Sequence, residues 1–351
     1  MAQTKHLDTR KIDPRLAVTL ESAEQNIEVL HRFRALGFVG HAIEMSGRFD
    51  FRCIMKLVRI IRTEKIDIIH SHGYKSDILG LIAGRIAGIR IVSTPHGFEN
   101  ARDLKLRFFI RAGCIALGFF DRVAPLSQEL VQDMLRIGIP KSKTGMIENG
   151  VDLSELEEEK RKKSARFFPD NREKRIGFVG NLIGRKNLKD MIDAFDLLSR
   201  RYPSVRLILI GDGPMRRELE TRAGSLPSGD RIEFWGYRDD RLQIVEELDL
   251  FAMTSALEGI PRCLMEAMGL DVPVVAYDIP GVDRLIENGR TGLSVPFGDI
   301  TGLAACWERI LNDPALSEKL ARNGRAHILR RFSAQRMARE YENLYQEMVT
   351  K

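Results

Sequence analysis

Cysteine is scarce in this sequence, and its spacing points to neither disulfides nor a bound metal. The 351 residues include four cysteines, at positions 53, 114, 263 and 306, and no Cys-x-x-Cys pair. Disulfide scaffolds and zinc sites need clustered cysteines, so the pattern indicates ordinary thiols in a reducing compartment. The first twenty residues are polar and mixed in charge, unlike a secretory signal. We therefore expect a cytoplasmic protein.

An apolar run long enough to cross a bilayer is also lacking. The most apolar stretch, residues 106–120, is shorter than the ~20 residues that a spanning helix needs, and it contains Arg111. Two interpretations fit this stretch. We take first a buried helix of an α/β domain, and second a helix that leans on the inner face of the plasma membrane as a peripheral contact.

The chain has no Gly-x-Gly-x-x-Gly loop between a strand and a helix, which argues against a dinucleotide-binding oxidoreductase. Its net charge of +6 and pI near 9.1 are mildly basic. Such a balance suits a polyanionic ligand, an anionic membrane or nucleic acid. No nucleic-acid-binding motif accompanies it, so we expect no nucleic-acid partner.

Strand-like apolar runs alternate with helix-like segments along the whole chain, which predicts parallel sheets covered on both faces. In the first half, strands are expected at 16–20, 42–45, 66–70, 90–94 and 122–125, with a further short strand at 141–148. In the second half they are expected at 175–179, 205–210, 232–235, 249–253 and 272–276. The tail from 299 to 351 is expected to be helical, with breaks at 313–314 and 332–333.

A charged run, ELEEEKRKK at 155–163, separates the two halves. Solvation explains such a run without any function, so we expect an exposed helix or a linker. The predicted organisation is a first domain over 1–150, a charged linker over 151–173 and a second domain over 174–333. The last helix, 334–351, is assigned to the first domain.

In the second half, a glycine-containing or polar loop follows each predicted strand. These loops cover residues 180–187, 211–214, 236–240, 255–261 and 278–282. The loops at the carboxyl ends of parallel strands lie at one edge of the sheet, where ligands bind. We therefore expect five loops that are far apart in sequence to meet at one site.

The loop at 255–261 is the most informative, because two glutamates stand eight positions apart around a helix start. Pro261 is favoured in the first turn of a helix, so the helix should begin near it. Glu258 then lies in the loop and Glu266 in the helix. The free N–H groups at the helix start suit a phosphate, and Gly259 lets the backbone approach a ligand. On spacing alone, most such glutamate pairs are solvated surface residues, and only the neighbouring residues favour a functional interpretation.

Together, these segments resemble the retaining glycosyltransferases of the group 1, family 4 type. The matching motifs in the second half are GFVGNLIGRKNL (177–188), LILIGDGP (207–214), IEFWGYRDD (232–240), EGIPRCLMEAMG (258–269), PVVAYDIPGVDRLIENGRTGL (273–293) and FSAQRMAREYENLYQEM (332–348). Those in the first half are IDIIHSHGYKSDILG (66–80), STPHGF (93–98), DRVAPLSQEL (121–130) and IENGVD (147–152).

The resemblance implies an α/β protein of the GT-B fold, with two facing Rossmann-like domains and a last helix that crosses back onto the first. It implies transfer of a hexose from a nucleotide diphosphate sugar, of which UDP-sugars are the commonest, to a saccharide or lipid-linked acceptor hydroxyl. The anomeric configuration would be retained. Neither a metal nor another cofactor is implied, and the expected role is in cell-surface polysaccharide or glycolipid synthesis.

The resemblance also implies roles for individual residues. Glu258 would lie against the donor sugar, with the amides around Gly259 and Ile260 near its hydroxyls and phosphate. Lys186 would hold the diphosphate, Glu266 would bind the ribose, and His96 would face the sugar from the first domain. Around them, the further donor-binding candidates are Asn181, Arg185, Gly213, Gly236, Tyr237 and Arg238.

The chain departs from the family in four places. Asn181 stands where the family has arginine, although Arg185 can supply the charge, and Arg284 and Asp271 replace a usual glutamate and glycine. No glycine precedes Gly37, so the family's first strand, Gly-Gly loop and helix are expected to be missing. Loss of that strand would expose strand edges. The alternative function is therefore a GT-B relative that binds nucleotide without turnover.

Overall fold

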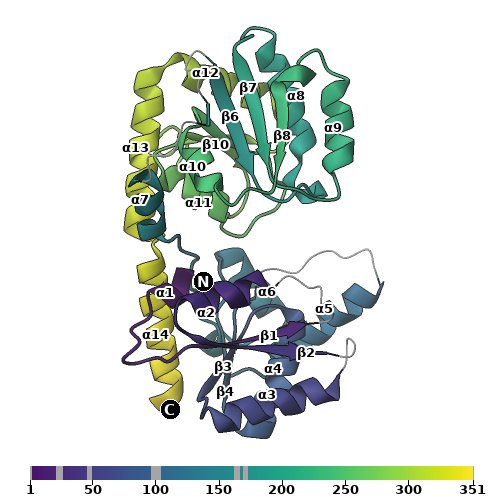
Figure 1. The fold of residues 1–351 in the computed structure, drawn as a ribbon, viewed down its shortest axis with the longest axis vertical. Helices are drawn as coiled ribbons and strands as arrows, with labels where there is room; N and C mark the ends of the chain where they lie inside the picture. Colours follow the sequence, from purple (N-terminus) through teal and green to yellow (C-terminus); the bar gives the residue numbers. More distant parts are fainter. Residues whose placement is uncertain are drawn as a thin grey trace. The chain divides into compact units, whose positions relative to one another are not determined.

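The computed structural model describes residues 2–20, 27–45, 50–95, 104–161, 167–168 and 173–350 (Figure 1). The chain divides into two compact units. Unit 1 comprises Met1–Asn149 and Ala334–Lys351, and unit 2 comprises Gly150–Ser333. Each unit is an α/β assembly with parallel strands, as the alternation of strand-like and helix-like segments predicts.

Unit 1 contains two parallel sheets within its described residues. Their strands are β1 (Arg15–Leu20) and β2 (Val39–Glu44) in one sheet, and β3 (Ile68–Ser71), β4 (Arg90–Ser93) and β5 (Arg122–Val123) in the other. The helices are α1 (Ala2–Lys5), α2 (Glu28–Ala35), α3 (Phe51–Thr63), α4 (Tyr74–Ala87), α5 (Leu104–Leu117) and α6 (Gln128–Arg136). The expected absence of the family's first strand, Gly-Gly loop and helix stays untested.

The strand expected at 141–148 is wrong. Residues Lys141–Lys143 form a short 3₁₀ helix, and the backbone after it meets β5 at a single parallel bridge, between Val123 and Thr144. The segment is still extended, because Gly145 N donates to Val123 O and Ile147 N donates to Pro125 O. Because β5 is only two residues long, it is too short to pair with a full strand at 141–148.

Unit 2 contains a six-stranded parallel sheet in the order β11-β10-β9-β6-β7-β8. The strands are β6 (Lys174–Val179), β7 (Val205–Ile210), β8 (Ile232–Gly236), β9 (Leu250–Met253), β10 (Val274–Asp278) and β11 (Leu293–Pro296). β6, β7, β9 and β10 are almost wholly buried, which is why they appear in the sequence as continuous apolar runs. The short edge strand β11 was not predicted, because serine and proline interrupt its apolar pattern.

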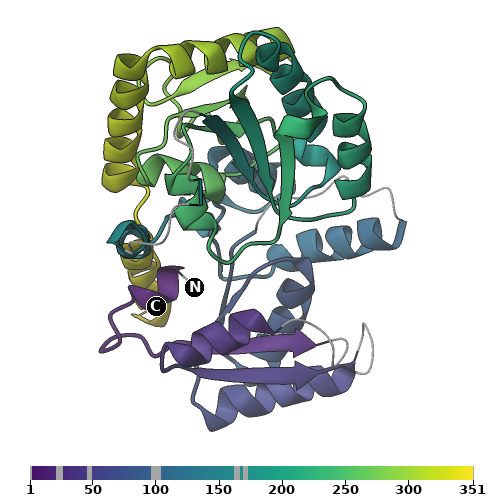
Figure 2. The same ribbon diagram turned by 45° about the horizontal axis from the view of Figure 1, so that its top comes forward.

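Helices cover both faces of this sheet, as both ribbon views show (Figure 1 and Figure 2). They are α7 (Leu153–Arg161), α8 (Leu188–Ser199), α9 (Arg216–Gly224), α10 (Arg241–Glu246), α11 (Arg262–Gly269), α12 (Ile300–Asn312) and α13 (Pro314–Arg331). The charged run forms a helix, α7, which is one of the two expected forms, and this helix packs against α10 and α11 inside unit 2. Leu156 is the reason, since it is buried in the core of this unit.

The helical tail ends in α14 (Ala334–Thr350), which belongs to unit 1. The breaks before α13 and α14 fall at Asp313 and Phe332–Ser333, where they were predicted. Asp313 caps α13 by accepting from Leu316 N. No helix in the described ranges is long and apolar enough to cross a membrane.

A polar network fastens α14 to unit 1. The Tyr345 hydroxyl lies 2.6 Å from His70 Nδ1 and accepts a hydrogen bond from Gln3 Nε2. His70 Nε2 lies 2.8 Å from Thr94 Oγ1, which in turn meets the Tyr341 hydroxyl at 2.9 Å. Burial raises the pKa of Tyr341 to about 12, so its hydroxyl stays protonated at neutral pH. The network therefore joins α1, β3 and the end of β4 to the last helix.

Replacing Tyr345 by phenylalanine should destabilise unit 1. The change leaves His70 Nδ1 and the Gln3 amide without their shared partner, at a cost of about 1–2 kcal/mol. A urea unfolding curve should therefore shift to a lower midpoint than that of the wild type. Tyr237→Phe is the matched control, because Tyr237 is exposed on unit 2. Equal midpoints for the two variants would contradict this role of the network.

Candidate functional site

The loops that follow β6, β7 and β8 are joined by backbone contacts at the carboxyl edge of the sheet. Leu182 N donates to Asp212 O at 2.9 Å, and Gly211 N donates to Gly236 O at 2.7 Å. Gly211 has a φ of +132°, and a Cβ there would lie 2.0 Å from the carbonyl oxygen of Gly180. Only glycine permits that approach. The three loops consequently form one continuous surface.

The loop after β9 joins the same surface through the loop after β6. Ala256 N donates to Arg185 O at 2.8 Å, and Thr254 Oγ1 donates to Lys186 O at 3.0 Å. The loop after β10 packs on it in turn. Gly281 has a φ of +90°, and a Cβ there would lie 1.5 Å from the carbonyl oxygen of Gly259. The predicted meeting of five loops is thus confirmed.

A buried ion pair between Lys186 and Glu258 lies where these loops meet. Lys186 Nζ lies 2.5 Å from Glu258 Oε1, and the two side chains are 11% and 9% exposed. A charged side chain is rarely buried this deeply without a partner of opposite charge, because the desolvation cost is several kcal/mol per ion. The sequence separation of 72 residues makes this a contact that only the fold produces.

Helix α11 places Glu266 beside this pair. The helix starts at Arg262 with Pro261 as its N-cap, within one residue of the predicted start. Glu266 is 4% exposed. Its Oε1 accepts hydrogen bonds from Arg262 Nε at 2.8 Å and from Arg241 Nη2 at 2.9 Å. Because both arginines use the same oxygen, they fix the carboxylate and leave Oε2 to a further donor.

Cys263 lies among these charged groups but is not a nucleophile. Desolvation raises the pKa of its thiol to about 12, and the nearby carboxylates of Glu258 and Glu266 act in the same direction, against the effect of Lys186. A thiol with such a pKa stays protonated at neutral pH, and the thiolate is the reactive form.

The loop after β8 presents a planar cation beside an exposed ring. Arg238 donates two hydrogen bonds to Asp240, at 2.7 Å and 2.5 Å, and its guanidinium lies 5.8 Å from the Trp235 ring centroid. Tyr237 is exposed next to it, and Gly236 has a φ of +69°. Flat, polar-edged groups of this kind suit stacking with a planar ligand.

The remaining predicted residues lie on the same loops, with one exception. Asn181 and Arg185 are exposed on the loop that carries Lys186, and Ile260 is buried next to Glu258. A Cβ at Gly213 would lie 2.6 Å from Leu182 O, so this glycine serves loop packing. His96 lies outside the described residues.

Two arginines of the site were not predicted. Arg262 stands four positions before Glu266 on one helix, a spacing that favours an ion pair and could have identified it. Arg241 comes from α10, 25 residues away, and no local pattern links it to Glu266. The same holds for Tyr277, whose hydroxyl donates to Asp190 Oδ2 and ties β10 to the start of α8.

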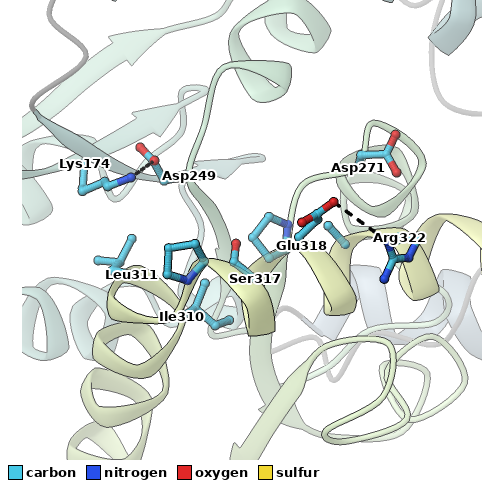
Figure 3. Close-up of a pocket in the computed structure, with 11 residues that line it drawn as sticks. Lys174, Asp249, Asp271, Ile310, Leu311, Ser317, Glu318 and Arg322 are labelled. Atoms are coloured by element: carbon cyan, nitrogen blue, oxygen red, sulfur yellow. Dashed lines mark hydrogen bonds and ion pairs between the residues drawn. The ribbon is translucent and has the colours of Figure 1, made fainter.

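A cavity of about 440 Å³ lies elsewhere on unit 2, where β6, β9 and β10 begin (Figure 3). α12 and α13 form its other walls. Four of its charged side chains pair with each other, Lys174 with Asp249 and Arg322 with Glu318, and Asp271 pairs with Arg325. Since β6 runs from this cavity to the loop that carries Lys186, the cavity is at the opposite edge of the sheet from the five loops.

Family comparisons match almost the whole chain. Residues 159–327 match the family described as Glycosyl transferases group 1, and residues 2–155 match the family described as Glycosyltransferase Family 4. The first match contains Lys186, Glu258 and Glu266, together with all five loops.

The individual relatives have low sequence identity to this chain, but the matches extend over most of its length. The chain is 26% identical over 303 residues to the putative glycosyltransferase EpsD of Bacillus subtilis (strain 168), an overlap of 83% of this chain and 79% of EpsD. It is 27% identical over 330 residues to the UDP-Gal:alpha-D-GlcNAc-diphosphoundecaprenol alpha-1,3-galactosyltransferase of Escherichia coli, with 86% and 80% covered.

Solved structures show the same architecture. The structure of Anabaena HepE in complex with UDP matches with a TM-score of 0.80 at 22% identity, over 99% of this chain and 96% of HepE. Sucrose-phosphate synthase from Thermosynechococcus elongatus matches with a TM-score of 0.73 at 20% identity, over 96% and 99%. The fold of the chain is therefore GT-B, as the resemblance implied.

Gly281→Ala should destabilise unit 2 more than Gly289→Ala does. Both glycines have positive φ, +90° and +76°, so both substitutions carry a similar backbone strain of roughly 1–2 kcal/mol. A Cβ at Gly281 also collides with the Gly259 carbonyl, whereas a Cβ at Gly289 meets no atom within 4 Å. Thermal unfolding should show the difference. Equal losses would contradict the close packing of the two loops.

Proposed function

Because the chain belongs to the group 1 glycosyltransferases, we propose that it transfers a sugar from a UDP-sugar to an acceptor hydroxyl and retains the anomeric configuration. One observation carries the proposal: a buried cation, Lys186, pairs with Glu258 in the loop that leads into α11, and this helix carries the fixed carboxylate of Glu266. A nucleoside diphosphate sugar needs a cation for its phosphates and acceptors for its hydroxyls.

Lys186 and the start of α11 are the groups that hold the diphosphate in this proposal. The ammonium group supplies a full positive charge, and the first amides of α11 supply free N–H groups and a partial positive charge. Arg185, exposed on the same loop, adds a second cation. Developing negative charge on the leaving phosphate is stabilised by such groups when they are already in place. In the described part of the chain, no three His, Cys, Asp or Glu side chains gather as a metal site requires.

Glu266 binds the ribose in this proposal. Its Oε1 is occupied by Arg241 and Arg262, so Oε2 is the oxygen that accepts from a ribose hydroxyl. The two guanidinium groups hold the carboxylate in one orientation, which lowers the ordering cost of binding. Arg238 and Tyr237 frame the base on the neighbouring loop.

Glu258 faces the sugar end of the donor. Its carboxylate accepts a hydrogen bond from Lys186, so the sugar site and the phosphate site are one ion pair apart. The reaction breaks the bond between the anomeric carbon and the phosphate oxygen, and forms the bond to the acceptor oxygen on the same face. The acceptor proton passes to the departing phosphate. A glycosidase-type carboxylate pair is not required, because Glu266 is committed to the ribose.

The acceptor is a saccharide or a lipid-linked saccharide in this proposal. Its support is the printed name of the Escherichia coli relative, which is a galactosyltransferase for a diphosphoundecaprenol-linked sugar. A lipid-linked acceptor would bring the protein to the inner face of the plasma membrane. The product would then enter polysaccharide or glycolipid synthesis.

Titration calorimetry with UDP tests the nucleotide site. Glu266→Gln keeps the shape of the side chain but removes the charge, and we expect UDP affinity to fall at least about 30-fold, the equivalent of about 2 kcal/mol. Glu318→Gln, an exposed change on α13, is the control and should bind like the wild type. Unchanged affinity in Glu266→Gln, or no binding by a folded wild type, would contradict the proposed site.

Turnover separates an enzyme from a relative that only binds nucleotide. Lys186→Gln should lower kcat by roughly 100- to 1,000-fold, because the cation stabilises the leaving phosphate. Cys263→Ser should leave kcat within about threefold, since its protonated thiol has no chemical role. Sugar transfer to a lipid-linked acceptor, followed by chromatography, supplies the rates. UDP binding with no transfer from any UDP-sugar would favour the non-catalytic alternative.

A further inference from the structure

Helix α3 has an exposed side on which every charge is positive. Arg52, Lys56, Arg59 and Arg62 recur at helical spacing and are all exposed, and the helix contains no acidic residue. The opposite side is apolar and buried in unit 1. Such a helix, basic on its outer side, is typical of proteins that bind an anionic surface.

The exposed side of α3 also carries apolar side chains. Phe51 is 68% exposed and Met55, one turn later, is 49% exposed. Burying them would be favourable, and no described residue of unit 1 does so. The pairing of exposed apolar groups with a row of cations distinguishes this surface from the ordinary solvated side of a helix, where cations alternate with carboxylates.

Two neighbouring helices extend the same pattern. α4 packs against α3 on one side and against α5 on the other (Figure 1 and Figure 2). α4 exposes Ile82 and Ile86 next to Arg85. Ile115 near the C-terminal end of α5 and Phe119, two residues beyond that end, are 68% and 58% exposed.

Contacts between the helices make these groups one surface. Arg62 Nη2 donates to Ile86 O, which joins α3 to α4, and Arg85 Nη2 donates to Phe119 O, which joins α4 to the end of α5. We call this the basic-apolar face. It consists of the exposed side chains Phe51, Arg52, Met55, Lys56, Arg59, Arg62, Ile82, Arg85, Ile86, Arg111, Ile115 and Phe119.

Acidic groups do not balance the charge of this face. The three helices contain nine lysines and arginines, four in α3, two in α4 and three in α5, against a single acid, Asp77. Asp77 is buried, and burial raises the pKa of its carboxyl. Of the described carboxylates nearby, Asp50 caps α3, Glu64 pairs with Arg15, and Asp121 accepts from Ile91 N. Glu44 is exposed at the end of β2, where its backbone carbonyl accepts from Lys56 Nζ.

We propose that the basic-apolar face binds the surface of an anionic phospholipid bilayer. The cations meet the lipid phosphates, and the apolar side chains enter the boundary between headgroups and acyl chains. Four of the six apolar residues of the face are aliphatic and offer no ring on which a nucleic-acid base could stack, and the two rings, Phe51 and Phe119, lie on different elements. The lipid-linked acceptor of the proposed function is the reason for such a contact, although the face itself is independent of the donor site.

Vesicle flotation tests the proposal with the full chain. The probes are vesicles of phosphatidylcholine alone and of phosphatidylcholine with phosphatidylglycerol in equal parts. The wild type should float with the anionic vesicles at low salt and dissociate as salt screens the charges. It should stay unbound with the neutral vesicles.

Two charge-reversal variants make a matched pair. Arg52→Glu with Lys56→Glu and Arg59→Glu changes the basic-apolar face, and the affinity for anionic vesicles should fall about 100-fold, from three basic residues near the membrane. Arg217→Glu with Lys319→Glu and Arg330→Glu makes the same change of net charge at exposed positions on unit 2. The affinity of this control for anionic vesicles should be about that of the wild type and at least ten times that of the face variant.

A third variant tests the apolar half of the face. Ile115→Ser with Phe119→Ser should weaken vesicle binding but leave binding to heparin, a soluble polyanion, unchanged. Thermal unfolding checks that all three variants fold. UDP calorimetry on the same samples separates this surface from the donor site, because every variant should bind UDP like the wild type.

Three results would overturn the proposal: a wild type that does not float with anionic vesicles at low salt, face and control variants that float equally, or Ile115→Ser with Phe119→Ser floating like the wild type. One pattern would assign the face to a soluble polyanion instead of a membrane. In it, the face charge-reversal variant loses vesicle binding and heparin binding equally, and the serine variant loses neither.

Discussion

The contact on which the site depends is the ion pair of Lys186 and Glu258. Two charges removed from water need each other, so the loops after β6 and β9 cannot separate without exposing or orphaning one of them. Further contacts of the β9 loop, with the β6 loop and with the β10 loop, hold it in the same position. Thr254 and Ala256 hold the β9 loop to the backbone of Lys186 and Arg185, and Gly281 presses on the carbonyl of Gly259 from the next loop. A negatively charged ligand in this site interacts with the ammonium group of Lys186, which the ion pair already holds in place.

Much of this arrangement could be predicted from the sequence, because its causes are local. Buried parallel strands appear as apolar runs, and β7 was predicted with both of its ends correct. The helix start at Pro261 follows from the conformation of proline, and the meeting of the five loops follows from the topology of parallel sheets. What could not be predicted depends on contacts between distant segments. Arg241 reaches Glu266 from another helix, and α7 packs on unit 2 because Leu156 is buried in its core. The strand expected at 141–148 failed for a similar reason, since a two-residue β5 gives it no partner.

Charged side chains are arranged differently in the two units. The difference matches the ligands proposed for them, a nucleotide sugar for unit 2 and a lipid bilayer for unit 1. Around the candidate site in unit 2, cations are paired: Lys186 with Glu258, Arg241 and Arg262 with Glu266, Arg238 with Asp240. Pairing fixes their geometry, which recognition of a small, defined ligand requires. On the exposed sides of α3 and α4 in unit 1, Arg52, Lys56, Arg59, Arg62 and Arg85 have no carboxylate of their own helix and lie beside exposed apolar groups. Such a surface suits a partner that is large, anionic and without defined geometry, which a lipid bilayer is.

The central claim is that a nucleoside diphosphate sugar binds at the carboxyl edge of the unit 2 sheet. A crystal structure of the chain grown with UDP tests it most directly. The account predicts the diphosphate within hydrogen-bond distance of Lys186 Nζ and the ribose on Oε2 of Glu266, with Oε1 still held by the two arginines. UDP bound elsewhere, for example in the cavity between Lys174 and Arg322 at the opposite edge, would contradict it.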